Sequence, residues 1–272
     1  MSLMTENNQT VTGPPFRGRR GLKAMIFAAG LGTRFKPWTD QHPKALAMVN
    51  GKSLLQRNIE YLQQYGITDV VVNVHHFADQ IMEAVEKNNG WGSKVLISDE
   101  RSEVLETGGG LLKARPLLEG DEPFVSINVD ILTNLNLHHL LTFHQQQKPL
   151  ISFAVTNRKT ARNFLFDEEN RLCGWRNNVT GDEKGPHLEL RSFPLGTPRR
   201  EGKKLIEKAY SCVVIFEPMV FSLIKQTGKF SLTETYLDLA QDHLIMGYDH
   251  SGDVLVDVGK LDSVAVAESF FV

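Results

Sequence analysis

The chain has 272 residues, of which 41% are hydrophobic and 23% charged, with a formal net charge of -2. This length suits one large α/β domain or two small ones. The charge lacks the basic footprint of nucleic-acid-binding proteins, and no apolar run is long enough to cross a bilayer. Two cysteines, Cys173 and Cys212, form neither a disulfide framework nor a zinc-ligand spacing. We therefore expect no nucleic-acid partner, no membrane partner and a cytoplasmic location, because unpaired cysteines are typical of reducing compartments.

Residues 1–22 are polar and rich in glycine, proline and arginine, which predicts a flexible N-terminal tail. After them come four short apolar runs that predict buried strands: Lys23–Ala28, Asp69–Val74, Lys94–Ser98 and Pro123–Asn128. Helical spacing of apolar residues predicts helices at Leu54–Tyr65 and Phe77–Asn88, and Ser53 with Gln56 predicts a cap for the first. Strands that alternate with helices predict a parallel sheet whose ligands bind at the carboxyl ends of the strands.

The alternation weakens in the second half. Phe164–Asp167 and Leu172–Trp175, separated by a short polar turn, predict a hairpin, and His187–Phe193 is a further candidate strand. We interpret residues 157–207 as a substrate-side insertion within a single domain of residues 23–272. The remaining expected elements are two strands and two helices: Lys208–Phe216, Val254–Val258, Leu232–Met246 and Leu261–Phe271.

A glycine-rich loop follows the first strand: Ala28-Ala29-Gly30-Leu31-Gly32-Thr33-Arg34. Such loops let backbone N–H groups approach phosphate oxygens. A dinucleotide fingerprint would need glycine where Phe35 stands, which argues against a dehydrogenase. A Walker loop ending at Gly51-Lys52-Ser53 would need glycine where Leu46 stands, so this tripeptide is interpreted as a turn and helix cap.

Two cations accompany the loop. Arg34 ends it, and Lys44 follows in Pro43-Lys44-Ala45-Leu46. Transfer of a phosphoryl or nucleotidyl group needs cations of this kind, since negative charge builds on the phosphate oxygens and the leaving group. Either cation alone would be an ordinary surface residue, but together with the loop they indicate a phosphate site.

The loop, Pro37 and the Pro43–Leu46 segment together resemble the signature of the sugar-phosphate nucleotidyltransferase family. The resemblance spans about residues 23–272 and implies a nucleotide-diphospho-sugar transferase fold. That fold is α/β and Rossmann-like, with a mixed, mainly parallel sheet flanked by helices. Leu105-Glu106-Thr107-Gly108-Gly109-Gly110 is similar to the N-acetylmuramic acid 1-phosphate uridylyltransferase and mannose-1-phosphate guanylyltransferase branch. The implied substrates are a nucleoside triphosphate, with UTP favoured and GTP next, and a sugar 1-phosphate.

The resemblance also implies roles for individual residues. Arg34, Lys44 and Asp130 would be catalytic, and Asp130 and Asp257 would hold Mg²⁺, which prefers carboxylates and substrate phosphates. Gly109 and Ser211 would contact the sugar phosphate. The nucleotide would be bound by Ala28, Ala29, Gly30, Gly32, Thr33, Arg34, Lys44, Glu106, Thr107 and Gly108. Lys260 follows Gly259 where the family often has threonine, which puts nearby sugar-phosphate contacts in doubt.

Two other functions remain open from the sequence. A cytidylyltransferase acting on an alcohol phosphate would use the same core and differ around residues 164–204. A non-catalytic sugar-nucleotide-binding regulatory protein would share the fold, although the retained Arg34, Lys44, Asp130 and Asp257 favour an enzyme. The oligomeric state cannot be predicted from the sequence.

Overall fold

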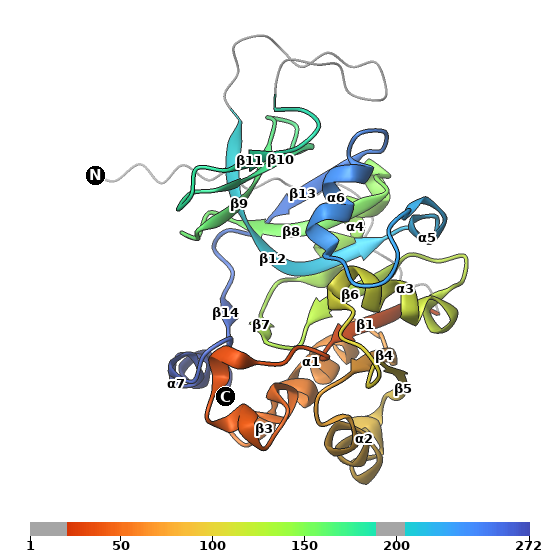
Figure 1. The fold of residues 1–272 in the computed structure, drawn as a ribbon, viewed down its shortest axis with the longest axis vertical. Coiled ribbons are helices and arrows are strands. Elements are labelled where there is room, and N and C mark those ends of the chain that lie inside the picture. The colour runs from red at the N-terminus through yellow and green to blue at the C-terminus, as the bar shows by residue number, and fades with distance from the viewer. Residues whose placement is uncertain (1–20, 189–204) are drawn as a thin grey trace.

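The structure, a computed structural model, describes residues 21–188 and 205–272 (Figure 1). The predicted N-terminal tail lies outside the described residues, apart from Gly21 and Leu22. None of the helices within the described ranges is long and apolar enough to span a membrane.

A large mixed sheet forms the centre of the fold. Its parallel part has the strand order β5-β4-β1-β6, with these bounds: β1 Lys23–Phe27, β4 Asp69–Val74, β5 Lys94–Asp99 and β6 Phe124–Asn128. The long strand β12 (Ile206–Phe216) pairs antiparallel with β6 and with β8 (Ile151–Thr156). Strand β13 (Ile245–Asp249) then runs parallel to β8. All four predicted strands of the first half are confirmed to within one residue.

The first half of β12 also carries the hairpin. It pairs with β9 (Arg162–Phe166), which pairs with β10 (Leu172–Asn177), and β10 pairs with the short β11 (Glu183–Lys184). Figure 1 shows these strands at the far end of β12 from α1, α2 and α3. The predicted hairpin is therefore confirmed. The predicted strand His187–Phe193 is wrong at its first two residues, which form a turn, and its remainder lies outside the described residues.

Helices cover both faces of the sheet, and their bounds are α1 Leu54–Gln63, α2 Ala78–Lys87, α3 Glu106–Leu118, α4 Leu137–Gln147, α5 Val220–Leu223, α6 Leu232–Leu239 and α7 Asp262–Phe270. Successive residues of a strand point to opposite faces. Thus Ile26 belongs to the core cluster that contains Ile59 of α1, whereas Met25 belongs to the cluster that contains Leu111 of α3 and Tyr236 of α6. At the start of α1, Ser53 Oγ accepts a hydrogen bond from the Gln56 N–H at 3.1 Å, which confirms the predicted cap.

Two predictions for the C-terminal half need correction. The helix expected at Leu232–Met246 ends at Leu239, because Ile245 and Met246 pair beside β8 as part of β13. The strand expected at Val254–Val258 forms, as β14 (Leu255–Asp257), but it lies outside the large sheet. It pairs antiparallel with the short β7 (Ile131–Thr133), and a second small ribbon joins β2 (Met48–Val49) to β3 (Lys52–Ser53).

Candidate functional site

The glycine loop follows the carboxyl end of β1, and its first residue is held by Asn73 of β4, which is held in turn by Glu100 just after β5. The Ala28 N–H donates to Asn73 Oδ1 at 2.7 Å, and Asn73 Nδ2 donates to Glu100 Oε1 at 2.8 Å. Burial of Glu100 raises the pKa of its carboxyl group. Ala28 is buried, Ala29 is partly buried and Gly30 is exposed, so the loop rises from the core into solvent. Asn73 and Glu100 are supporting residues that the sequence analysis did not identify.

The second glycine of the loop brings Lys44 close. Gly32 has a φ of +61°, and a Cβ there would lie 2.8 Å from Thr39 Cγ2 and 3.3 Å from Lys44 Cβ. Thr39 Oγ1 donates to the Gly32 carbonyl at 2.9 Å and closes the turn. Gly32 is thus required both by its left-handed backbone and by close packing. Thr33 and Arg34 follow in a short 3₁₀ turn, and both are exposed.

The two predicted metal-binding carboxylates lie at the same edge of the fold. Asp130 stands between β6 and β7, and Asp257 ends β14 opposite Ile131 of β7. The Val258 N–H donates to the Asp130 carbonyl at 2.8 Å, so the two chain segments are joined beside both carboxylates. Asp257 is exposed, whereas the Asp130 side chain is 15% exposed.

Each of these carboxylates lies near one of the predicted cations. Lys44 Nζ donates to Asp130 Oδ2 at 2.5 Å. A Cβ built on Gly259 would lie 2.7 Å from Asp257 Oδ1 and 2.9 Å from Arg34 Nη2, so this carboxylate and this guanidinium border the same small space. The structure therefore brings together all four residues that the sequence analysis assigned to charge chemistry.

The oxygen donors here suit a hard divalent cation. Mg²⁺ takes one or two protein carboxylates and completes its octahedron with phosphate oxygens and water. Within residues 21–188 and 205–272, no group of three or more His, Cys, Asp or Glu side chains is arranged to hold a metal ion. Asp130 and Asp257 could therefore bind Mg²⁺ together with substrate phosphates, but they do not form an all-protein cage.

The glycines at the start of α3 serve packing in this structure. The N–H groups of Gly108 and Gly109 donate to the Phe230 carbonyl at 2.9 and 3.4 Å. A Cβ on Gly108 would lie 2.3 Å from the Phe230 ring, and one on Gly109 would lie 2.1 Å from the Gly228 carbonyl oxygen. Both N–H groups are thus engaged within the protein, and the predicted contacts of Gly108 with the nucleotide and of Gly109 with the sugar phosphate stay predictions. Thr107 Oγ1 likewise accepts from the Leu232 N–H at 3.1 Å, and the exposed Glu106 lies 3.7 Å from Lys229 Nζ.

A β-bulge in β12 borders the carboxylates. The pairing register with β8 shifts between Tyr210 and Val214, and Cys212 has a φ of +57°. Burial raises the pKa of the Cys212 thiol well above its usual value, and the charges of Asp130 and Asp257 raise it further. A bulge next to an active site changes the direction of a single side chain. Here that side chain is Cys212, whose thiol lies within electrostatic reach of Asp130 and Asp257. No local sequence signal identifies this bulge.

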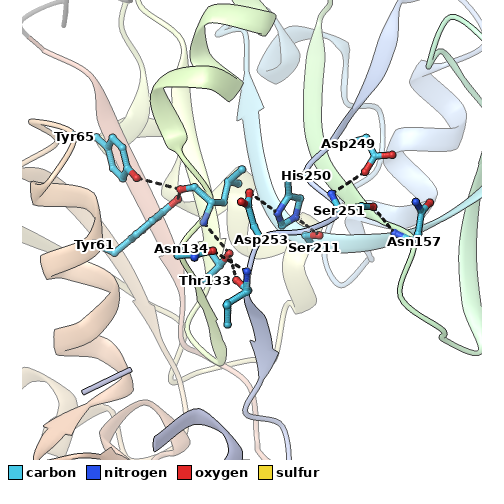
Figure 2. A network of polar contacts seen from close by, with 12 residues as sticks. Tyr61, Tyr65, Thr133, Asn134, Asn157, Ser211, Asp249, His250, Ser251 and Asp253 are labelled. Carbon is cyan, nitrogen blue, oxygen red and sulfur yellow. Dashed lines mark hydrogen bonds and ion pairs between the residues drawn. The ribbon is translucent and has the colours of Figure 1, made fainter. Parts of the chain in front are cut away.

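Ser211, which was predicted to contact the sugar phosphate, lies inside the protein. It is fully buried, and its Oγ lies 2.8 Å from His250 Nε2 (Figure 2). The sequence could not reveal this contact, because His250 directly follows β13 and lies 39 positions from Ser211 along the chain.

A polar network holds the chain leading into β14 (Figure 2). Thr133 Oγ1 donates to the Val254 carbonyl at 2.8 Å, and the Val254 N–H donates to Asn134 Oδ1 at 2.7 Å. His250 Nδ1 lies 3.4 Å from Asp253 Oδ2 in the turn before Val254. Because β14 carries Asp257, these contacts fix the position of one predicted metal ligand relative to the other.

Comparison with known proteins gives this geometry a context. A family model described as "Nucleotidyl transferase" matches residues 23–165. The chain is 44% identical over 110 residues to N-acetylmuramate alpha-1-phosphate uridylyltransferase of Caulobacter vibrioides, a match that covers 39% of this chain and 45% of that protein. It is 34% identical over 137 residues to mannose-1-phosphate guanyltransferase beta-B of Xenopus laevis, covering 50% of this chain and 38% of that protein. The matches thus span less than half the length of these relatives.

The crystal structure of HddC from Yersinia pseudotuberculosis complexed with GMP-PN superposes with a TM-score of 0.71. That superposition covers 92% of this chain and 100% of HddC, at 20% sequence identity. At this identity the likeness concerns the fold, and it confirms the predicted mainly parallel α/β architecture.

Proposed function

The chain belongs to the nucleotidyl transferase family, and from this premise we propose that it transfers a nucleoside monophosphate from a nucleoside triphosphate to a sugar 1-phosphate, releasing pyrophosphate. The observation that supports this most is the pairing of Lys44 with Asp130, next to the shared space of Arg34 and Asp257, beside the glycine loop. In this arrangement the two cations can offset part of the phosphate charge, and the two carboxylates can hold a metal ion that offsets more of it.

In the proposed reaction, a phosphate oxygen of the sugar 1-phosphate attacks the α-phosphorus of the triphosphate in line with the departing pyrophosphate. One P–O bond forms as the α–β P–O bond breaks. A phosphate monoester is largely ionised near neutral pH, so the attack needs no general base. The catalytic contribution of the protein is then positioning and charge neutralisation, because the chemistry is carried by the phosphates themselves.

We assign the four charged side chains separate parts of this task. Asp130 and Asp257 would hold Mg²⁺, which when bound supplies positive charge to the reacting phosphates. Arg34 stabilises the departing pyrophosphate from the glycine-loop side. Lys44 contacts phosphate oxygens of both reactants, and its bond to Asp130 Oδ2 keeps it in position before the substrates arrive. Such preorganised contacts typically contribute on the order of 10²–10³ in rate each.

For the nucleotide we propose UTP, with GTP as the second candidate. The uridylyltransferase of Caulobacter vibrioides is 44% identical over its match, and the guanyltransferase of Xenopus laevis is 34% identical. A cytidylyltransferase acting on an alcohol phosphate and a non-catalytic nucleotide-sugar-binding protein are the alternatives that the experiment must exclude.

The test is pyrophosphate release from each ribonucleoside triphosphate combined with each member of a panel of sugar 1-phosphates and alcohol phosphates, with and without Mg²⁺. The proposal predicts Mg²⁺-dependent release with UTP and a sugar 1-phosphate. Release only with CTP and an alcohol phosphate would replace the proposal with the first alternative. If folded protein binds a nucleotide sugar but releases no pyrophosphate with any substrate pair, the result would favour the non-catalytic nucleotide-sugar-binding protein.

A further inference from the structure

The order of strands defines two sides of the carboxylate pair. The glycine loop follows β1, Asp130 follows the adjacent β6, and β12 lies next to β6 on the other side. If the triphosphate lies on the glycine loop, the sugar lies toward β12. Arg158 belongs to this side, because its Nη2 donates to the Tyr210 carbonyl at 2.7 Å, two residues before Cys212 in the bulge.

The segment that carries Arg158 is fixed at several points. The N–H of the preceding Asn157 donates to Ser251 Oγ at 2.8 Å, and the Ser251 N–H donates to Asp249 Oδ1 at 2.9 Å (Figure 2). Lys208 Nζ donates to Asn157 Oδ1 at 2.5 Å. A side chain on a segment held in this way loses little conformational freedom when it binds a ligand, so its interaction contributes more to affinity.

Arg158 is an exposed cation that has no carboxylate partner in the part of the chain that the structure describes. Throughout the described ranges 21–188 and 205–272, no carboxylate forms an ion pair with it, whereas Lys44 pairs with Asp130 and Lys208 with Asp249. Only one of its five N–H donors has a partner among these residues, the Tyr210 carbonyl. Burial and the two site carboxylates raise the pKa of Cys212, and the charge of Arg158 opposes this rise, so the guanidinium lies within electrostatic reach of the site.

We propose that Arg158 binds a carboxylate group on the sugar, so that the acceptor is an acidic sugar 1-phosphate rather than a neutral one. This inference rests on the proposed function. The planar guanidinium offers paired donors that match the two oxygens of a carboxylate, and such charge-assisted pairs are stronger and more directional than bonds to neutral hydroxyls. A neutral sugar offers no such charge-assisted pair, so Arg158 acts as a specificity-determining residue.

The experiment compares two acceptors that have the same shape and differ in one charge: N-acetylmuramic acid 1-phosphate and the carboxamide of the same sugar phosphate. The readout is the ratio of their kcat/KM values at saturating triphosphate. The wild type is expected to prefer the acid. Arg158→Gln is expected to lower this ratio about ten- to hundredfold, chiefly through the KM of the acid, because only the charge-assisted pair is lost. Arg158→Lys should restore part of the ratio, since it keeps the charge without the planar fork.

Lys159→Gln is the matched control, because it removes the neighbouring exposed cation, which has no hydrogen bond or ion pair within the described part of the chain. It is expected to leave the ratio unchanged. An equal loss for both acceptors in Arg158→Gln would overturn the inference, since Arg158 would then bind the common 1-phosphate or support the fold. Equal use of both acceptors by the wild type would also overturn it while leaving the proposed function intact. Absence of turnover with every triphosphate and acceptor would instead overturn the proposed function itself.

Discussion

The substitution Gly259→Ala tests the geometry of the site without removing any charged group. The added methyl would lie 2.7 Å from Asp257 Oδ1 and 2.9 Å from Arg34 Nη2. To regain ordinary contact, the carboxylate oxygen must retreat by roughly 0.7 Å and the guanidinium by a similar distance. Both atoms are the ends of exposed side chains, so the protein can adapt, and we expect the free energy of unfolding to change by less than about 1 kcal/mol.

Turnover, in contrast, should fall by about ten- to hundredfold, because catalytic groups displaced by a large part of an ångström lose much of their effect. The assay is pyrophosphate release under steady-state conditions, with thermal unfolding measured on the same sample. Gly120→Ala is the control: a Cβ there meets nothing within 4 Å, and the residue lies outside the left-handed region. Full turnover in a folded Gly259→Ala variant would refute the view that Arg34 and Asp257 act from one shared space.

Three further predictions follow from individual contacts. Lys44→Ala should lower kcat by about 10²–10³-fold while triphosphate binding, measured by calorimetry, persists, and an unchanged kcat would remove Lys44 from the mechanism. Ser53→Ala should lower the free energy of unfolding in urea by about 1 kcal/mol, since the cap of α1 is lost, and a loss near zero would contradict that role. Burial lowers the pKa of His250 below 6.5, although Asp253 opposes the shift. The unfolded chain therefore binds a proton that the native state does not, and stability should fall as the pH drops below about 6.5. In urea titrations at several pH values, the free energy of unfolding of His250→Gln should fall less steeply with decreasing pH than that of the wild type. An identical pH dependence of both proteins would show that His250 does not contribute.

The features that could be predicted from the sequence were local ones. The run Asp69–Val74 contains four valines, which favour a buried strand, and it forms β4 with the predicted bounds. The glycine loop could be predicted because the left-handed φ and the close packing at Gly32 require glycine, and a glycine at a fixed position is visible in the sequence. Arg34 and Lys44 could be assigned because they accompany that loop.

The features that were missed depend on pairing between distant segments. Asn73 and Glu100 support the loop only because β4 lies beside β1 and β5 lies beside β4 in the sheet. The predicted helix 232–246 was too long, because pairing of β13 with β8 overrides helical spacing in its last residues. The burial of Ser211 was not predicted either, because it accompanies a bulge in β12 and a contact with His250, which is 39 positions away. Such partners leave no periodic or compositional signal near the residue concerned.

The central claim is that Asp130 and Asp257 together support metal-dependent nucleotidyl transfer, and one measurement tests it most directly. The Mg²⁺ dependence of pyrophosphate release would be compared in the wild type, Asp130→Asn and Asp257→Asn, with the best substrate pair from the panel. Thermal unfolding would establish that each variant is folded. The account predicts that both variants bind the triphosphate but lose most turnover, and that higher Mg²⁺ restores part of it. Near-wild-type turnover in a folded Asp130→Asn or Asp257→Asn variant, with unchanged Mg²⁺ dependence, would contradict the account.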